Sequence, residues 1–139
     1  MNDISEYLQA ISIAVLVAYF LLNTRRVVKA IELCRECLLL LKGKPGIKGQ
    51  KVWKLFYKKI YFIMANASSL IRNKANAIRY VEELLQISCE SGERLDECRL
   101  RIELAEMYDS QSKYRKAKDL YEKALHVSKE ISRKDLEAC

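Results

Sequence analysis

One stretch of sequence decides the fold of this chain: LRIELAEMYDSQSKYRKAKDLYEKALHVSKEI, residues 100–131. Apolar and small side chains recur there at intervals of three and four residues, on both sides of a polar break at 109–112. This spacing is typical of amphipathic helices, and the short polar break is sufficient for a tight turn between them. The stretch therefore predicts a helical hairpin. Its apolar positions are Leu104, Ala105, Tyr108, Tyr114, Ala117, Tyr121, Ala124 and Leu125.

The same pattern occurs twice more, earlier in the chain. Ala77 lies 40 residues before Ala117, and Ala30 lies 47 residues before Ala77, each followed by apolar residues at the same intervals. The longer first interval is explained by the glycine-rich loop at 42–49. Three copies of one hairpin are therefore predicted, with a fourth repeat or a short capping helix beginning after them. The copies cover residues 4–42, 50–90 and 93–131, and the remainder is 132–139.

The motif Leu-Ala-x-x-Tyr, followed by Tyr-x-x-Ala-x-x-x-Tyr-x-x-Ala-Leu, resembles the tetratricopeptide repeat (TPR), and its long period is similar to the Pins/LGN type of array. The resemblance implies an all-α fold, namely an α-solenoid of three helix-turn-helix hairpins plus a short C-terminal helix, in one domain over residues 1–139. It also implies a scaffold that binds protein partners and has no enzymatic activity. The carboxylate clamp of chaperone-binding TPRs is not matched, since Val15 and Tyr19 stand where its first lysine and asparagine belong.

In TPR proteins the first helix of each hairpin lines a concave groove that binds peptides or helices, and the resemblance implies such a groove here. Lys59, Asn66 and Arg99 could hold a carboxylate or a peptide backbone in it. The alternative is that these residues are ordinary polar surface. The groove residues expected from the register are Tyr19, Asn23, Lys59, Phe62, Asn66, Arg99, Glu106 and Asp109.

Charge is distributed unevenly along the 139 residues, whose net charge is +7. Residues 37–80 contain ten basic residues and no acid, whereas residues 81–139 contain fourteen acids and eleven bases. The aromatic residues between the lysines leave two interpretations open. Either this is a solvated lysine face on a helix with a core of aromatics, or it is a surface for an acidic protein, nucleic acid or anionic lipid. The basic patch is Lys42, Lys44, Lys48, Lys51, Lys54 and Lys58.

The first predicted helix is apolar nearly all round, from Leu8 to Leu22. This run is shorter than the roughly 20 residues needed to span a membrane, so we predict no transmembrane segment. A helix that is apolar on all sides must be covered on all sides. Either a missing repeat or a second copy of the chain would cover it, and we therefore predict self-association or docking on a missing neighbouring repeat. The residues assigned to it are Ile11, Ile13, Val15 and Phe20.

The cysteines and the histidine give little support for catalysis, metal binding or redox activity. The five cysteines are odd in number and favour a reducing, cytoplasmic location over a disulfide framework. Cys34 and Cys37 occupy apolar positions of a helix and are predicted to be buried thiols without a metal. The single histidine, His126, has no apparent acid–base partner, and no phosphate-binding loop is present. We therefore predict no cofactor and no catalytic residue, and the alternative function is binding of nucleic acid or an anionic surface through residues 42–59.

Overall fold

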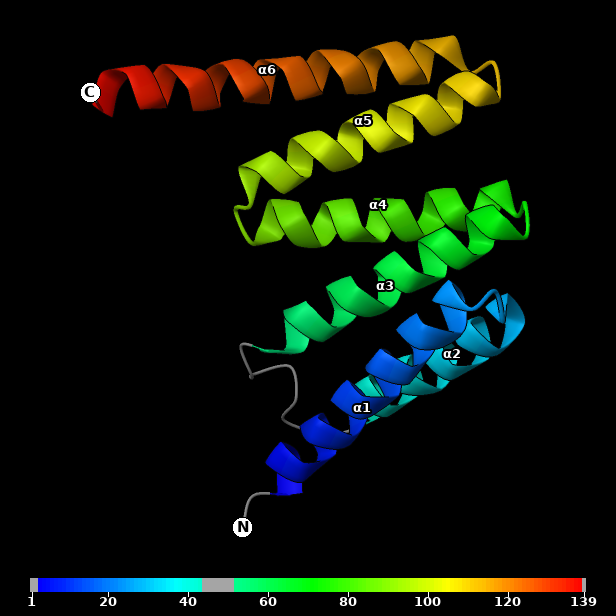
Figure 1. The fold of residues 1–139 in the computed structure, drawn as a ribbon. Helices are drawn as coiled ribbons and strands as arrows, with labels where there is room; N and C mark the ends of the chain where they lie inside the picture. The colour runs from blue at the N-terminus through cyan, green and yellow to red at the C-terminus, as the bar shows by residue number, and fades with distance from the viewer. Residues whose placement is uncertain (1–2, 44–51, 139) are drawn as a thin grey trace. The chain divides into compact units, whose positions relative to one another are not determined.

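The computed structural model describes residues 3–43 and 52–138, and these residues form six α-helices and no strand, which confirms the predicted all-α class. The chain divides into two compact units, Met1–Tyr80 and Val81–Cys139, with the boundary inside the fourth helix. The helices are α1 (Asp3–Asn23), α2 (Val27–Gly43), α3 (Val52–Leu70), α4 (Lys74–Glu90), α5 (Arg94–Ser110) and α6 (Tyr114–Ala138) (Figure 1).

Four of the turns between helices share one backbone geometry. In the first, the N–H of Arg26 donates to the carbonyl of Leu21 at 2.8 Å, and the N–H of Arg25 donates to Leu22 at 3.1 Å. This pair of bonds is a Schellman motif, which ends a helix with one residue in the left-handed conformation. The same two bonds recur at the other three turns. The left-handed residues are Arg25 (φ 67°), Arg72 (φ 61°), Gly92 (φ 71°) and Ser112 (φ 61°).

The next helix begins in the same way after each of these turns. The residue that follows the left-handed residue by five positions makes the first hydrogen bond of this new helix. Its N–H donates to the carbonyl of the residue four positions before it, at 2.9–3.1 Å, and its side chain is buried. Ala30, Ala77 and Ala117 occupy this position, as their spacing in the sequence predicts. A small residue there allows close approach of a neighbouring helix. The fourth occupant is Glu97, only 8% exposed, which sequence reasoning did not single out.

In the first unit, α1 and α2 form an antiparallel hairpin and α3 packs against both (Figure 1). The hydroxyl of Tyr7 in α1 donates to the carbonyl of Leu40 in α2 at 2.5 Å, which joins the two helices at their open ends. One face of α1 and one face of α2 are buried together, at helical spacing. The buried residues of these two helices are Ile11, Val15, Ala18, Leu22, Ala30, Ile31, Cys34, Cys37 and Leu41.

Among the described residues, α1 is also the one helix whose length and composition would let it cross a membrane, over Ser5–Asn23. This candidate span is longer than the apolar run from Leu8 to Leu22 on which the prediction from sequence was based. The core helix of a globular protein and a secretory signal satisfy the same criterion. Because the inner face of α1 is packed against α2 and α3, the described chain has no clear transmembrane segment.

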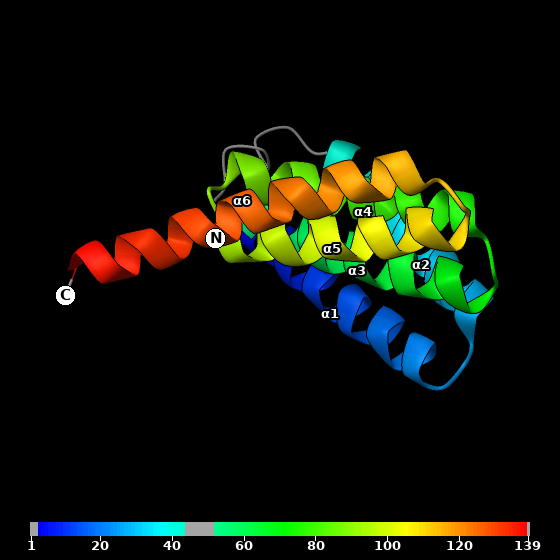
Figure 2. The same ribbon diagram turned by 90° about the horizontal axis from the view of Figure 1, so that it is seen from above.

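In the second unit, α5 and α6 form a hairpin, and α6 is longer than predicted. The sequence suggested that α6 ends at Ile131 and that a separate short helix follows. The structure corrects this, since α6 continues without a break to Ala138 and its last turns extend beyond α5 (Figure 2). The physical reason is that residues 132–138 contain neither glycine nor proline, and none of them forces the helix to end.

Candidate functional site

A groove of about 400 Å³ lies between the C-terminal ends of α1 and α3 in the first unit. We call it the α1–α3 groove. Four residues assigned to a partner groove from the sequence register line it together, and they come from two helices far apart in the chain. Its lining is Tyr19, Leu22, Asn23, Arg25, Phe62, Asn66, Ser69 and Leu70, of which Tyr19, Asn23, Phe62 and Asn66 were predicted.

The walls of this groove combine apolar and polar groups. Tyr19 and Phe62 are about half exposed, at 47% and 50%, so their rings can still bury apolar surface against a ligand. Asn66 donates its side-chain N–H to the carbonyl of Phe62 at 2.8 Å, which fixes its amide one helical turn beyond the ring. Together these side chains offer an apolar surface bordered by polar groups, a composition that is usual in ligand-binding clefts.

The end of α1 beside the groove is held by local hydrogen bonds. The hydroxyl of Thr24 shares its one proton between the carbonyls of Phe20 at 3.0 Å and Leu21 at 3.2 Å. The same two carbonyls also accept the backbone N–H groups of Thr24 and Arg26, so both backbone and side chain close the last turn of α1. Arg25 then follows in the left-handed conformation, with its backbone N–H bound to Leu22. The lining residue Arg25 is therefore presented from a turn with a defined backbone conformation.

Charge favours an acidic ligand in the α1–α3 groove. Arg25 is the only charged residue in the lining that the structure gives, and Lys59 is exposed on α3 one turn before Phe62. The first unit as a whole contains fourteen basic and four acidic residues, a net charge of +10. The second unit contains eleven basic and fourteen acidic residues, a net charge of −3. The division between the two units thus coincides with the change in charge.

The remaining predicted groove residues are not part of this lining. Lys59 lies just outside it, and Arg99, Glu106 and Asp109 belong to α5 in the second unit, where all three are exposed. Arg99 lies 4.0 Å from Asp96, one turn earlier on the same helix. The structure therefore brings together four of the five groove residues predicted on the first two hairpins.

The basic patch is described only in part. Lys42 is exposed at the end of α2, and Lys54 and Lys58 on α3 are half-buried, while Lys44, Lys48 and Lys51 lie outside the described residues. The aromatic residues between the lysines form a row in which ring centroids are 4.6, 5.8 and 6.0 Å apart. Its three tyrosines are buried and its tryptophan is half-buried, so the tyrosine rings belong to the core and are closed to nucleic-acid bases. The row is Trp53, Tyr57, Tyr61 and Tyr80.

The residues assigned to self-association separate into two groups. Ile11 and Val15 are 1% and 6% exposed because they pack inside the first unit, so they cannot contact a second copy and this part of the prediction is corrected. Ile13 and Phe20 are 63% and 60% exposed on the opposite face of α1. Sequence could not separate the groups, because α1 is apolar on both faces.

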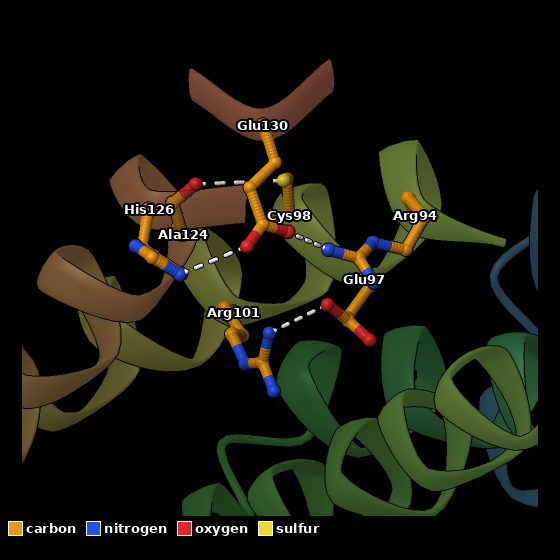
Figure 3. A network of polar contacts seen from close by, with 7 residues as sticks. All are labelled: Arg94, Glu97, Cys98, Arg101, Ala124, His126 and Glu130. Atoms are coloured by element: carbon orange, nitrogen blue, oxygen red, sulfur yellow. Dashed lines mark hydrogen bonds and ion pairs between the residues drawn. The ribbon is translucent and has the colours of Figure 1, made fainter. Parts of the chain in front are cut away.

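A polar cluster between α5 and α6 in the second unit was not predicted (Figure 3). Arg94 forms an ion pair with Glu130, whose other oxygen lies 3.0 Å from His126 Nε2, and Arg101 lies 2.7 Å from Glu97. The cluster borders a cavity of about 470 Å³ whose lining carries four acids, two arginines, a lysine and the histidine. Opposite charges are nearly balanced and largely paired with one another, so the cluster offers no concentrated charge to a ligand.

Glu97 is the most buried acid of this cluster. A hydrogen bond with the Cys89 thiol, together with Arg101 and Arg94, lowers the pKa of Glu97 against the opposing effect of burial. The spacing of Glu97 and Arg101, and of His126 and Glu130, is i,i+4 and could have been read from the sequence. The contact between Arg94 and Glu130 spans 36 residues and has no local sequence signal.

The predicted buried thiols are confirmed. Cys34 and Cys37 are each 1% exposed, and burial with the neighbouring Cys37 raises the pKa of Cys34 to about 12. Burial likewise raises the pKa of Cys37 and Cys98, which keeps these thiols protonated and unreactive. In the described part of the chain no three histidine, cysteine or acidic side chains come together as they would to hold a metal ion.

Comparison with known proteins adds no relative: no protein family, no curated protein and no solved structure matches this chain.

Proposed function

We propose that this chain is a non-catalytic, TPR-like module for protein–protein interaction, and that its α1–α3 groove binds an acidic peptide through an apolar anchor. The observation that carries the proposal is the convergence of Tyr19, Asn23, Phe62 and Asn66 on one groove. The repeat pattern of the sequence alone predicts these four residues on the groove side of the first helices of the first two hairpins. Convergence of this kind is expected if α1 and α3 are equivalent first helices of successive repeats.

The repeated turn supports the same proposal. Identical Schellman bonds at Arg25, Arg72 and Ser112, each followed by a buried alanine, give every hairpin the same entry into its second helix. A repeat protein builds its binding surface by placing one element of each repeat side by side. In the first unit, α1 and α3 contact each other and supply the two walls of the groove.

The chemistry of the groove defines the peptide. An aromatic or leucine side chain would bury apolar surface against Tyr19 and Phe62, and a carboxylate nearby would pair with Arg25. The net charge of +10 on the first unit would attract an acidic segment and accelerate its association. Binding of nucleic acid, the alternative function, gains no support from the aromatic row, since its tyrosines are buried.

A peptide-display selection on the whole chain tests this function. We expect enrichment of sequences that place an aromatic or leucine residue next to Asp or Glu. A synthetic peptide from the selection is then titrated by fluorescence anisotropy against the chain and its variants. Phe62→Ala and Arg25→Ala should each weaken binding about tenfold or more, in keeping with loss of a half-buried ring and of a charged hydrogen bond.

Two controls make the result specific. Arg26→Ala removes an exposed charge next to Arg25 that does not line the groove, and it should change the affinity less than twofold. A peptide with Gln and Asn in place of Glu and Asp should bind at least tenfold more weakly. Selection without enrichment, or binding that is unchanged by Phe62→Ala, would contradict the proposed function.

A further inference from the structure

The outer face of α1 is an exposed apolar stripe. We define the α1 stripe as Ile13, Leu16, Val17 and Phe20, which are 63%, 68%, 45% and 60% exposed. Intervals of three, one and three residues place these side chains on one side of the helix, opposite the face that packs on α2 and α3. Isolated apolar side chains on a surface are ordinary, but four in one continuous row are typical of an interaction site.

The stripe is symmetric along the helix axis. Ile13 and Phe20 lie at equal distances on either side of the midpoint between Leu16 and Val17. A two-fold axis through this midpoint would set Ile13 of one copy against Phe20 of the other, and Leu16 against Val17. A surface related to itself by a two-fold axis in this way is what an isologous dimer requires.

Charges at the two ends of α1 fit the same symmetry. Glu6 is exposed near the beginning of the helix, about 16 Å from the midpoint of the stripe at the rise of an α-helix. Arg26 is exposed in the turn that follows the other end of α1, three residues after its last residue, Asn23. Antiparallel pairing brings the end of α1 that carries Glu6 in each copy towards the turn that carries Arg26 in the other. Parallel pairing would bring like charges together at both ends.

We propose that two copies of this chain associate through their α1 stripes, with the helices antiparallel. The occupant of the stripe is thus a second copy of the same surface. The interface is separate from the α1–α3 groove, because no stripe residue is among the groove lining. The dimer would therefore present two grooves, and bind a partner that carries two acidic segments more tightly than one that carries a single segment.

The test compares the oligomeric state of the 139-residue chain and of variants matched in chemistry. Sedimentation velocity over a wide dilution series should show a monomer–dimer equilibrium for the unchanged chain. Leu16→Glu should weaken dimerisation at least about 100-fold, because the charge enters the interface twice. Leu39→Glu is the control, since Leu39 is 71% exposed on α2 and outside the stripe. It should leave the dimer unchanged, and circular dichroism should show that both variants remain folded.

The antiparallel arrangement has its own test. Glu6→Arg and Arg26→Glu should each weaken the dimer by about 3- to 10-fold, and the double variant should recover most of the loss, because the pair is restored with its signs exchanged. Parallel helices would give no such recovery. Single charge changes without effect, or a double variant no better than the single ones, would overturn the antiparallel arrangement.

Other results would overturn the dimer itself. A monomer at every concentration would leave the stripe without a second copy, and a dimer that persists in Leu16→Glu would place the interface elsewhere. Sedimentation with vesicles of phosphatidylcholine, a lipid without net charge, tests whether the stripe binds lipid, since Ser5–Asn23 is by length and composition apolar enough to cross a bilayer. Vesicle binding by a chain that stays monomeric without lipid would replace the second copy with a membrane.

Discussion

Glu97 and Arg101 form an ion pair of 2.7 Å on α5, at the buried position where three other helices of the chain have alanine. Their side chains are only 11% and 18% exposed, so each charge is stabilised by the opposite charge of its partner and not by water. Removing one member of such a pair leaves the second charge poorly solvated. The pair is therefore a place where a single substitution should have a large effect.

Glu97→Ala is expected to lower the free energy of unfolding by about 1–3 kcal/mol, because Arg101 loses its carboxylate partner while staying largely buried. Glu97→Ala combined with Arg101→Leu should recover most of this loss, since the site then matches the alanine-bearing turns. Urea unfolding followed by circular dichroism measures all three chains. Glu122→Ala is the control and should change stability by less than about 0.5 kcal/mol, because the Lys118–Glu122 pair is exposed and 3.9 Å apart. A double variant as unstable as Glu97→Ala would contradict this account.

Tyr108 should make the second unit sensitive to alkaline pH. Its hydroxyl donates to Glu82 at 2.7 Å, and this hydrogen bond, together with burial, raises the pKa of Tyr108 to about 12 from its ordinary value of 10. Because the folded-state pKa lies above the unfolded one, the bond stabilises the fold fully below pH 10 and loses its effect as the pH rises towards 12. Ultraviolet titration of tyrosinate should show a late step that is missing in Tyr108→Phe. A Tyr108→Phe variant with the same titration curve as the unchanged chain would rule out this assignment.

Ser88 is fully buried in α4, and its hydroxyl has no hydrogen-bond partner among the described residues. An unpaired buried hydroxyl costs free energy that an apolar side chain would not. Ser88→Ala should therefore keep or raise the free energy of unfolding, by up to about 1 kcal/mol, although most substitutions of buried residues lower it. Thermal unfolding measures the change. A clear loss of stability in Ser88→Ala would show that the hydroxyl has a partner, such as a buried water.

The helices were predictable because their pattern is local. Alanines and larger apolar residues repeat at helical spacing, so all six helices were located, and the groove residues Tyr19, Asn23, Phe62 and Asn66 followed from the register. Arg25 was missed because its place in the groove depends on a left-handed conformation that arginine seldom adopts. The inner and outer faces of α1 could not be distinguished, since both are apolar and only the packing of α2 and α3 separates them. The contact of Arg94 with Glu130 depends on how α5 and α6 are aligned, which the sequence pattern does not specify.

Thiol labelling should separate the cysteines by position. Cys34, Cys37 and Cys98 are buried, whereas Cys89 is exposed. Burial raises the pKa of all four thiols, and the hydrogen bond to Glu97 adds to this for Cys89, so the difference in exposure is what should separate them. Iodoacetamide labelling followed by site-resolved mass spectrometry should modify Cys89 at least about tenfold faster than the other three in the native chain. Urea should remove the difference. Labelling of Cys34 as rapid as that of Cys89 without denaturant would show that the first unit opens on the time scale of the reaction.

The left-handed turns give a final test of the repeated backbone geometry. Gly92 has φ 71°, and an added Cβ would meet no atom within 4 Å, so the cost of Gly92→Ala comes from the backbone alone. We expect this variant to lower the free energy of unfolding by about 1 kcal/mol. Ser112→Gly should raise it by up to a similar amount, about 1 kcal/mol, because serine there is held in the same conformation at φ 61°.

Gly43 is the matched control, since it lies in α2 with equally open surroundings and without a positive φ. Gly43→Ala should therefore stabilise the chain, by up to about 1 kcal/mol, because alanine lowers the conformational entropy of the unfolded chain. Chemical unfolding of all three variants checks the signs, which should be opposite for the two glycines. If Gly92→Ala were as stabilising as Gly43→Ala, the turn at Gly92 would not have the left-handed geometry that Arg25, Arg72 and Ser112 share.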